Sequence, residues 1–439
     1  MPALKSTSGP STRGSGPHRR NDYSASLTTQ IWVPSTPRFR HPAWSEVAIF
    51  DYIKQSYIIT AESVLSTVRG VEGLDKKTAR KVNFYTRQFV DAIAPSNFIA
   101  TNPEVLKATL ESGGRNLLNG LANLLRDIDA SRRTLSITMS DLDAFRVGET
   151  IAATLGKVVF QNEMMQLIQY SPLTDEVRRV PLLIVPPWIN KFYVLDLRPR
   201  NSFIRWAVAQ GHTVFVISWV NPDARLAEKS FEDYMLQGPI AALDVVKTAT
   251  GERETNLLGY CLGGTLLAAT LAYLAAKGDT RAVSATFFAT LVDFTDVGDM
   301  AVFIDEEQLK ELEARMRDRG YLEAHENRLA MPGGITLAGV PIDLRKVEVP
   351  SFFLSTREDH IAPWRTTYGG TQLFSGPVTF VLAASGHIAG VISPPGSKYG
   401  HWQNPHHPTD PDEWFRTATA DSRGRLWRMS HERSGAIGL

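Results

Sequence analysis

The chain has 439 residues, of which 43% are apolar and 21% are charged, and its formal net charge at pH 7 is +1. This length predicts either one large domain with additional segments or two domains, and the balanced charge gives no indication of a nucleic-acid partner. The single cysteine excludes an intramolecular disulfide framework and a cysteine-rich metal site, and it fits a reducing compartment.

The first 28 residues predict a disordered arm, because they are rich in Ser, Gly, Pro and Arg and contain no apolar run. The missing apolar run also argues against a secretory signal. No stretch of about 18 uninterrupted apolar residues occurs anywhere in the chain, so no membrane-spanning helix is predicted.

Residues 29–142 predict a mainly helical N-terminal domain. Apolar residues recur at helical spacing in three stretches, residues 44–68, 79–94 and 106–128. Asn102-Pro103-Glu104 has the residues of a helix start, with Asn at the cap and Pro in the first turn. No arrangement of side chains in this half indicates chemistry.

Residues 143–439 predict a catalytic domain in which strands alternate with helices. The predicted strands are residues 157–161, 165–170, 181–186, 213–218, 255–258, 284–289, 350–355 and 378–383. The predicted helices are residues 202–210, 233–248 and 265–276, with a charged surface helix at 305–319. This alternation favours a mostly parallel sheet with helices on both faces.

The only cysteine lies in Gly259-Tyr-Cys261-Leu-Gly263, between a predicted strand and a predicted helix. A strand, a Gly-x-nucleophile-x-Gly turn and a helix form the nucleophile elbow of α/β-hydrolases. The glycines fit a turn too tight for side chains, and the N-terminus of the helix favours a thiolate. The alternative is an inert buried cysteine beside accidental glycines. We therefore predict an α/β-hydrolase-like, doubly wound sheet preceded by the helical domain, with Cys261 as nucleophile.

A thiol nucleophile needs a base, and the base needs an orienting acid. In this fold the chain order is nucleophile, acid, histidine, and Asp359 and His387 follow two predicted strands in that order. Both are expected at the carboxyl edge of the sheet, where sites in open α/β sheets form. The alternatives are His360 as the base, although it shares a loop with Asp359, and Glu358 as the acid.

The oxyanion hole is expected to use the backbone amide of Leu262 and one amide from the loop after residues 181–186. Pro186 and Pro187 in that loop have no N–H, so Trp188 or Ile189 is the predicted donor. A polar group near the C-terminus is predicted to be a solvated loop rather than a zinc site; its histidines are His401, His406 and His407. No metal and no organic cofactor is indicated.

Several motifs together resemble class I polyhydroxyalkanoate synthases from about Trp44 to Pro395. They are Gly259-Tyr-Cys-Leu-Gly-Gly264, Pro186-Pro-Trp-Ile-Asn-Lys191, Ser218-Trp-Val-Asn-Pro-Asp223, Ser355-Thr-Arg-Glu-Asp-His-Ile-Ala-Pro-Trp364 and Ser385-Gly-His-Ile-Ala-Gly390. The resemblance implies polymerisation of (R)-3-hydroxyacyl-CoA thioesters, with 3-hydroxybutyryl-CoA as the expected substrate, and release of CoA. It implies Cys261 as the acylated nucleophile, His387 as its base and Asp359 as the third member.

The resemblance also implies a growing polyester chain as partner, a cytoplasmic location on polyester granules and a homodimer. Candidates for the edge of the substrate site are Trp219, Asp223, His360 and Trp364, with core packing as the alternative for the two tryptophans. The family carries a cap segment of several dozen residues where this chain has only Ala324-His325, so a cap deletion is predicted near residues 323–327. Two other functions stay open: a cysteine-dependent thioesterase or hydrolase, and a non-catalytic granule-associated protein.

Overall fold

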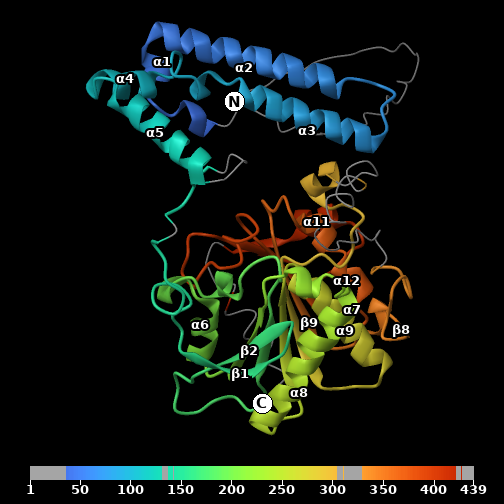
Figure 1. Cartoon of the computed structure of the whole chain (residues 1–439). Coiled ribbons are helices and arrows are strands. Elements are labelled where there is room, and N and C mark those ends of the chain that lie inside the picture. The colour runs from blue at the N-terminus through green and yellow to red at the C-terminus, as the bar shows by residue number, and fades with distance from the viewer. Residues whose placement is uncertain are drawn as a thin grey trace, which may run out of the picture. The chain divides into compact units, whose positions relative to one another are not determined.

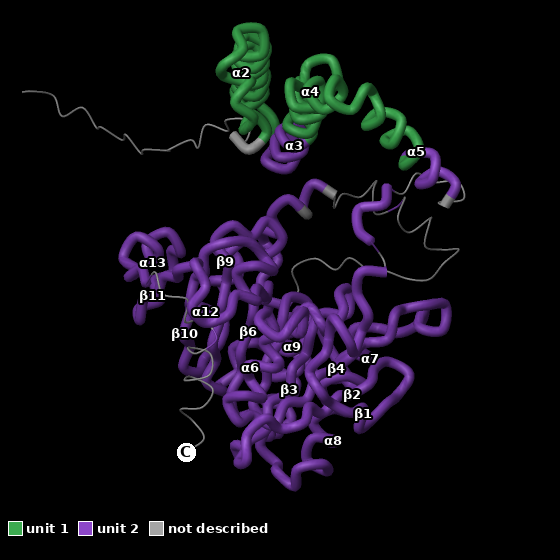
Figure 2. The backbone as a smooth tube through the Cα atoms, turned by 90° about the vertical axis from the view of Figure 1, so that its left-hand side faces the viewer, with its two compact units in different colours: residues 1–74, 85–123 green, residues 75–84, 124–439 purple. Residues whose placement is uncertain are grey.

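The computed structural model describes residues 36–130, 137–141, 143–303, 310, 329–421 and 427. The predicted arm over residues 1–28, most of the predicted helix 305–319 and the predicted cap deletion near 323–327 lie outside the described residues. The chain divides into two compact units, residues 1–74 with 85–123, and residues 75–84 with 124–439 (Figure 2). We describe each unit by itself, and the boundary between residues 142 and 143 stays a prediction.

The N-terminal region, residues 36–130, is helical, as its sequence predicts. Its helices are α1 (Ala43–Glu46), α2 (Ala48–Arg69), α3 (Lys76–Ala92), α4 (Pro103–Glu111) and α5 (Arg115–Ala130), with short 3-10 turns η1 (Thr36–Phe39) and η2 (Pro95–Asn97). The predicted start at Asn102 is confirmed, because its side chain accepts hydrogen bonds from the Glu104 and Val105 amides. The predicted continuous helix 106–128 is wrong, since Gly113 and Gly114 have positive φ angles of 57° and 85° and separate α4 from α5.

The first unit has a small core between α2 and α3. Tyr57, Ala61 and Leu65 of α2 are buried together with Val90 and Ala94. The Tyr57 hydroxyl donates a 3.0 Å hydrogen bond to the Val90 carbonyl, which satisfies its polar end inside this core. The pairing of the two helices therefore rests on a few apolar side chains and one buried hydroxyl.

The second unit is built on a sheet in which ten strands are described, in the order β1-β2-β4-β3-β5-β6-β9-β10-β11-β12. The strands are β1 (Gly156–Gln161), β2 (Met165–Tyr170), β3 (Leu182–Val185), β4 (Val214–Trp219), β5 (Thr255–Tyr260), β6 (Ala282–Phe288), β9 (Ser351–Thr356), β10 (Val378–Ala383), β11 (His401–Gln403) and β12 (Thr419–Asp421). The strands from β4 to β10 are parallel, and antiparallel pairs close both edges. Each strand predicted from an apolar run is confirmed to within two residues.

Helices cover both faces of this sheet (Figure 1). Successive residues of β3 illustrate why: Leu182 and Ile184 pack with α6 (Phe203–Ala209), while Leu183 and Val185 pack with α8 (Ala241–Thr250) and α9 (Leu262–Ala276). A strand with both faces buried is apolar at every position, which is the pattern of a central parallel strand. The parallel strands end at a common edge, so the loops that follow them come together there.

The remaining short elements connect these layers. They are η3 (Phe192–Leu195), η4 (Pro199–Asn201), η5 (Ala224–Leu226), η7 (Gly298–Phe303), η8 (Leu344–Lys346), α11 (Trp364–Thr367), α12 (Gly370–Leu373), α13 (Pro411–Thr417) and the hairpin β7 (Thr336–Leu337) with β8 (Val340–Pro341). Within the described ranges, no helix has the length and apolar character needed to span a bilayer.

The predicted helix 233–248 is wrong as a single element. It begins earlier, as α7 (Phe231–Met235), passes through the π-helical turn η6 (Leu236–Ile240) and continues as α8. Pro239 lies inside the turn and offers no N–H, and Gly238 has the non-helical angles φ −96° and ψ −105°. A Cβ on Gly238 would lie 2.3 Å from Cη2 of Trp219, so the turn brings the backbone against that indole.

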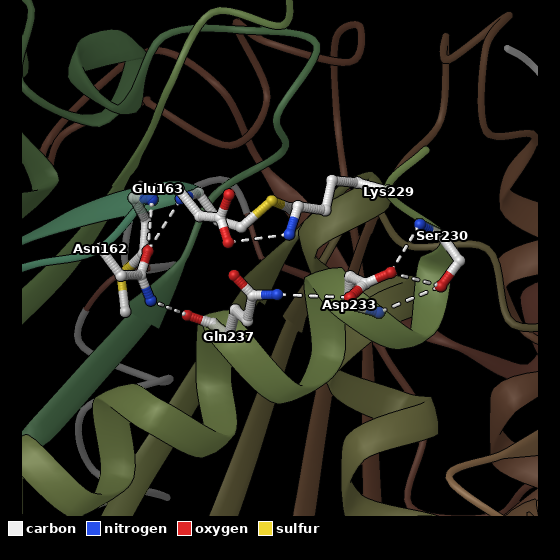
Figure 3. A network of polar contacts seen from close by, with 8 residues as sticks. Asn162, Glu163, Lys229, Ser230, Asp233 and Gln237 are labelled. Atoms are coloured by element: carbon white, nitrogen blue, oxygen red, sulfur yellow. Dashed lines mark hydrogen bonds and ion pairs between the residues drawn. The ribbon is translucent and has the colours of Figure 1, made fainter. Parts of the chain in front are cut away.

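A network of polar contacts fastens the turn between β1 and β2 to α7 and η6 (Figure 3). The labelled members are Asn162, Glu163, Lys229, Ser230, Asp233 and Gln237. Asn162 donates to the Gln237 carbonyl at 2.8 Å, and Lys229 pairs with Glu163 at 2.9 Å. Ser230 and Asp233 form a reciprocal capping box at the start of α7. The hairpin at the sheet edge is thereby held to the π turn.

Candidate active site

Cys261 lies in the sharp turn between β5 and α9. Its backbone angles, φ 53° and ψ −125°, are unfavourable for a residue with a side chain, and such strain marks functional turns. The Cys261 amide donates to the Phe288 carbonyl of β6 at 2.9 Å, and its own carbonyl accepts from Gly264 and Thr265 at the start of α9. These bonds hold the strained residue in place, and its side chain is half-buried.

The two glycines that flank Cys261 have no space for a side chain. A Cβ on Gly259 would lie 2.4 Å from the Cα of Gly264, and a Cβ on Gly263 would lie 2.1 Å from the Val185 carbonyl oxygen. The elbow thus has the geometry predicted from its sequence, and the start of α9 packs directly on the end of β3.

His387 and Asp359 meet at the same edge of the sheet, on the loops after β10 and β9. Nδ1 of His387 lies 2.7 Å from Oδ2 of Asp359. The Asp359 carboxylate also accepts from the Thr356 hydroxyl and from the Ile361 and Ala362 amides, at 3.1, 2.9 and 2.8 Å. Its side chain is fully buried, and all four contacts fix its orientation. The carboxylate therefore holds one nitrogen of His387 and leaves the other for a second partner.

Cys261 is the other group that acts on His387. Burial lowers the pKa of His387, but hydrogen bonds with Asp359 and the Cys261 side chain, together with the charges of both, outweigh it and raise the pKa to about 9. The structure therefore brings Cys261, His387 and Asp359 together in the order that a thiol, a base and an acid require. Their catalytic roles stay a prediction.

Tyr260, which the sequence analysis did not single out, holds the loop of His387 through two contacts. Tyr260, the last residue of β5, stacks on His387 with ring centroids 5.6 Å apart and an interplanar angle of 27°. Its hydroxyl donates to the His387 main-chain carbonyl at 3.2 Å. The only signal in the sequence was its position next to Cys261.

The two rivals considered for the base and the acid lie differently. The Glu358 and His360 side chains are exposed, whereas Asp359 and His387 are 7% and 8% exposed. The Glu358 amide donates to the Ser385 carbonyl at 3.0 Å, which ties the acid loop to the histidine loop. Ser385 itself has a φ of 80°, so the histidine loop also carries backbone strain.

The predicted oxyanion residues lie on neighbouring segments. Leu262 is the first residue of α9, where a backbone N–H has no partner within the helix. Trp188 and Ile189 lie in the turn after β3, with Trp188 half-buried and Ile189 exposed. Because Gly263 packs on the end of β3, the two segments adjoin. The donor roles of Leu262, Trp188 and Ile189 stay predictions.

The candidates for the substrate edge fall into two groups. Trp219 and Trp364 are buried in the core, 9% and 6% exposed; the Trp219 indole N–H donates to the Pro186 carbonyl at 2.7 Å. Asp223 is an exposed cap of η5 paired with Arg225, and His360 is exposed. The assignment of these four residues to the substrate edge stays a prediction.

The predicted solvated C-terminal histidine loop is wrong for one of its members. His401 is 1% exposed and begins β11, which pairs with β10. The described part of the chain contains no group of three or more His, Cys, Asp or Glu side chains placed to hold a metal ion.

The sheet order, the elbow and the loops after β9 and β10 define an α/β-hydrolase fold with cysteine in the nucleophile position. Among solved structures, a sugar hydrolase from Lactococcus lactis matches 64% of this chain and 97% of its own, at a TM-score of 0.39 and 12% identity.

Comparisons of sequence then identify the family. Residues 35–207 match the family model described as the poly-beta-hydroxybutyrate polymerase (PhaC) N-terminus. The poly(3-hydroxyalkanoate) polymerase of Methylorubrum extorquens is 45% identical over an alignment of 426 positions, and the alignment covers 84% of this chain and 70% of the relative. The polymerase subunit PhaC of Rhizobium meliloti is 44% identical, covering 89% and 73%, and that of Cupriavidus necator is 37% identical, covering 89% and 76%. The chain belongs to the poly(3-hydroxyalkanoate) polymerases.

The alignments also show that the relatives contain stretches that this chain lacks. The alignment with the Methylorubrum extorquens polymerase is 426 positions long, which is more than 84% of this 439-residue chain can supply. The cap deletion near residues 323–327 stays a prediction.

Proposed function

We propose that this polymerase joins (R)-3-hydroxyacyl-CoA units, 3-hydroxybutyryl-CoA among them, into a polyester through an acyl-cysteine intermediate at Cys261, with release of CoA. One observation carries the proposal: His387 bonds the buried carboxylate of Asp359 at the edge of the sheet, and Cys261 acts with Asp359 to raise the pKa of its imidazole. The names of the relatives support the polymerisation.

In the acylation step, His387 takes the proton of Cys261, and the thiolate attacks the thioester carbonyl of the substrate. The negative oxygen that forms is stabilised by the Leu262 amide and an amide of Trp188 or Ile189. The bond from the acyl carbon to the CoA sulfur then breaks, and the departing sulfur receives the proton from His387. The products are CoA and a 3-hydroxyacyl thioester on Cys261.

In the elongation step, the hydroxyl of a second hydroxyacyl unit attacks the thioester on Cys261. His387, held by Asp359, takes the hydroxyl proton and returns it to the departing Cys261 sulfur. One ester bond forms and one thioester bond breaks, which leaves the lengthened chain as the thioester of the second unit's CoA. That thioester acylates Cys261 again with loss of its CoA, so each cycle adds one unit and releases one CoA. The chemistry needs no metal and no organic cofactor beyond the CoA carried by the substrate.

The choice of sulfur fits this reaction. Exchange of one thioester for another is nearly isoenergetic, so the acyl group on Cys261 keeps its reactivity for the next attack. An oxygen ester on serine would lose that reactivity. Water must be excluded, since its attack on the same thioester would give the free acid. We place the protein, as a homodimer, on the surface of cytoplasmic polyester granules.

The test is to incubate the protein with 3-hydroxybutyryl-CoA and to score CoA, free 3-hydroxy acid and insoluble polymer together. We expect the wild type to release CoA and form polymer, and Cys261→Ala to do neither. Unchanged CoA release by Cys261→Ala would remove this residue from the mechanism. Free acid without polymer would instead select a thioesterase, and a folded wild type without turnover would select a non-catalytic granule protein.

A further inference from the structure

Tyr260 makes two separate contacts with His387, one through its ring and one through its hydroxyl. The side chain is 1% exposed, its ring stacks on the imidazole, and its hydroxyl donates to the carbonyl of the same residue at 3.2 Å. In the chain, Tyr260 is bonded directly to Cys261. One residue therefore connects the strand that presents the thiol with the loop that presents the imidazole.

The Tyr260 hydroxyl bonds a carbonyl of the histidine loop other than the two that accept the turn bonds of the loop itself. Within the loop, the amide of Gly390 donates to the Gly386 carbonyl, and the amides of Val391 and Ile392 donate to Ile388. The His387 carbonyl lies between these two acceptors and receives the Tyr260 hydroxyl. Loss of that hydroxyl would free the one peptide unit that carries the imidazole, while the turns around it keep their bonds.

We propose that Tyr260 is a positioning residue for the base: its hydroxyl fixes the main chain of His387 and its ring fixes the imidazole plane, so that the free ring nitrogen faces the Cys261 thiol. The inference rests on the proposed function, because it concerns the base in that mechanism. It assigns Tyr260 a part in holding the thiol–imidazole pair and no contact with the reacting atoms.

The hydroxyl stays a donor across the pH range in which the pair titrates. The titratable groups that act on His387 are Cys261 and Asp359, with Tyr260 as the third neighbour. Burial, with the charges of Cys261 and Asp359, raises the pKa of Tyr260 above its ordinary value of 10. Any change in the titration after removal of the hydroxyl therefore reports on position and not on loss of a charged tyrosine.

A second tyrosine in the same unit serves as a matched control. Tyr368 is also 1% exposed, and its hydroxyl also donates to a main-chain carbonyl, that of Pro408, at 2.7 Å. Its ring lies against Phe380 and Trp414. Tyr368→Phe therefore removes a buried bond of the same kind as Tyr260→Phe, without touching the histidine loop.

The experiment uses Cys261 as its own reporter, since the chain contains one cysteine. The rate of iodoacetamide alkylation is measured from pH 5 to pH 10 in the full-length wild type, Tyr260→Phe, Tyr368→Phe and His387→Gln. The thiolate is the reactive species, so the profile reports how well the imidazole stabilises it. The steady-state kcat and KM for CoA release from 3-hydroxybutyryl-CoA are measured alongside, and circular dichroism checks the fold.

We expect Tyr260→Phe to slow alkylation at pH 7 by roughly fivefold, the factor that one ordinary hydrogen bond represents. Its kcat should fall while KM stays within about twofold, because the buried Tyr260 side chain offers no surface to a substrate. Tyr368→Phe should lose similar stability and keep the wild-type profile and kcat. His387→Gln should also be alkylated more slowly than the wild type at pH 7, because the imidazole that stabilises the thiolate is gone.

The outcomes separate the inference from the proposed function. A Tyr260→Phe profile that coincides with the wild type, while His387→Gln is shifted, overturns the positioning role and leaves the mechanism in place. An unshifted His387→Gln profile contradicts the pairing of His387 with Cys261, and both proposals then fail. An equal shift in Tyr260→Phe and Tyr368→Phe also overturns the inference, because it would show a general loosening of the core.

Discussion

Two polar networks in the second unit use the same kinds of contact in different surroundings. At the site, the Asp359 carboxylate is fully buried and accepts four hydrogen bonds, one of them from His387. At the β1–β2 turn, the Glu163 side chain is 62% exposed and pairs with Lys229 at almost the same distance. Water competes with the exposed Glu163–Lys229 pair and is excluded from the buried Asp359–His387 pair. At nearly the same distance, the buried pair is therefore expected to contribute more.

The largest effect is expected where the buried network loses its charge. Asp359→Asn keeps the shape of the side chain but no longer holds His387 as a charged acceptor. We expect kcat for CoA release to fall by roughly 10²–10⁴-fold, the range of positioned acid–base groups. Asp343→Asn, at a cap of η8 paired with Arg345, should leave kcat within about twofold and serves as the control. Equal kcat values for the two variants would contradict the expected difference between the buried carboxylate at the site and a carboxylate in an ion pair elsewhere.

The second effect is a dependence of stability on pH. The pKa of folded His387 is raised to about 9 from 6.5, so the protonated ring stabilises the fold fully below about pH 6.5, and this contribution is lost as the pH rises through 9. The difference in unfolding free energy between the wild type and His387→Gln should shrink by at most about 3 kcal/mol between pH 6 and pH 10. Urea unfolding at several pH values measures it, and a difference that grows with pH would have the wrong sign.

A third prediction concerns a buried contact beside the site. Trp219→Phe keeps an aromatic ring but removes the N–H that donates to the Pro186 carbonyl at the exit of β3. Leaving that carbonyl without its indole partner is expected to cost about 1–2 kcal/mol of unfolding free energy, measured by urea unfolding. If Trp219→Phe lowered the unfolding free energy by less than removal of the exposed Glu163–Lys229 pair does, the expected difference between buried and exposed contacts would be contradicted.

The smallest effect is expected at the exposed network. Glu163→Gln removes the ion pair with Lys229 and should change the unfolding free energy by less than about 0.5 kcal/mol, with CoA release unchanged. Asn162→Ala at the same turn is the sharper comparison, because that side chain bonds the Gln237 carbonyl and the Met164 and Met165 amides. It should cost about 1 kcal/mol, measured in the same way.

The parts of the fold that the sequence predicts are those that local patterns specify. Buried parallel strands are apolar at every position, and the cap at Asn102 needs only the next three residues. The elbow could be predicted for the same reason, since a glycine on each side of Cys261 and a strand–helix change lie within a short segment. Asp359 and His387 followed from strand ends and chain order.

The parts that were missed depend on contacts between distant residues. The π turn at Gly238 forms where the backbone packs on Trp219, and β11 is too short and polar to be recognised before β10 offers it a partner. Tyr260 has the ordinary appearance of a strand residue, and only the fold brings His387 over its ring. Such contacts are decided by tertiary packing, which no local pattern contains.

The central claim is that the sulfur of Cys261 carries the growing chain. The direct measurement is mass spectrometry of peptides from the protein quenched in acid during turnover of 3-hydroxybutyryl-CoA. We predict 3-hydroxybutyryl groups on the peptide that contains Cys261, removable by hydroxylamine as expected for a thioester. Turnover with that peptide unmodified, or with the acyl group on another residue, would contradict the account.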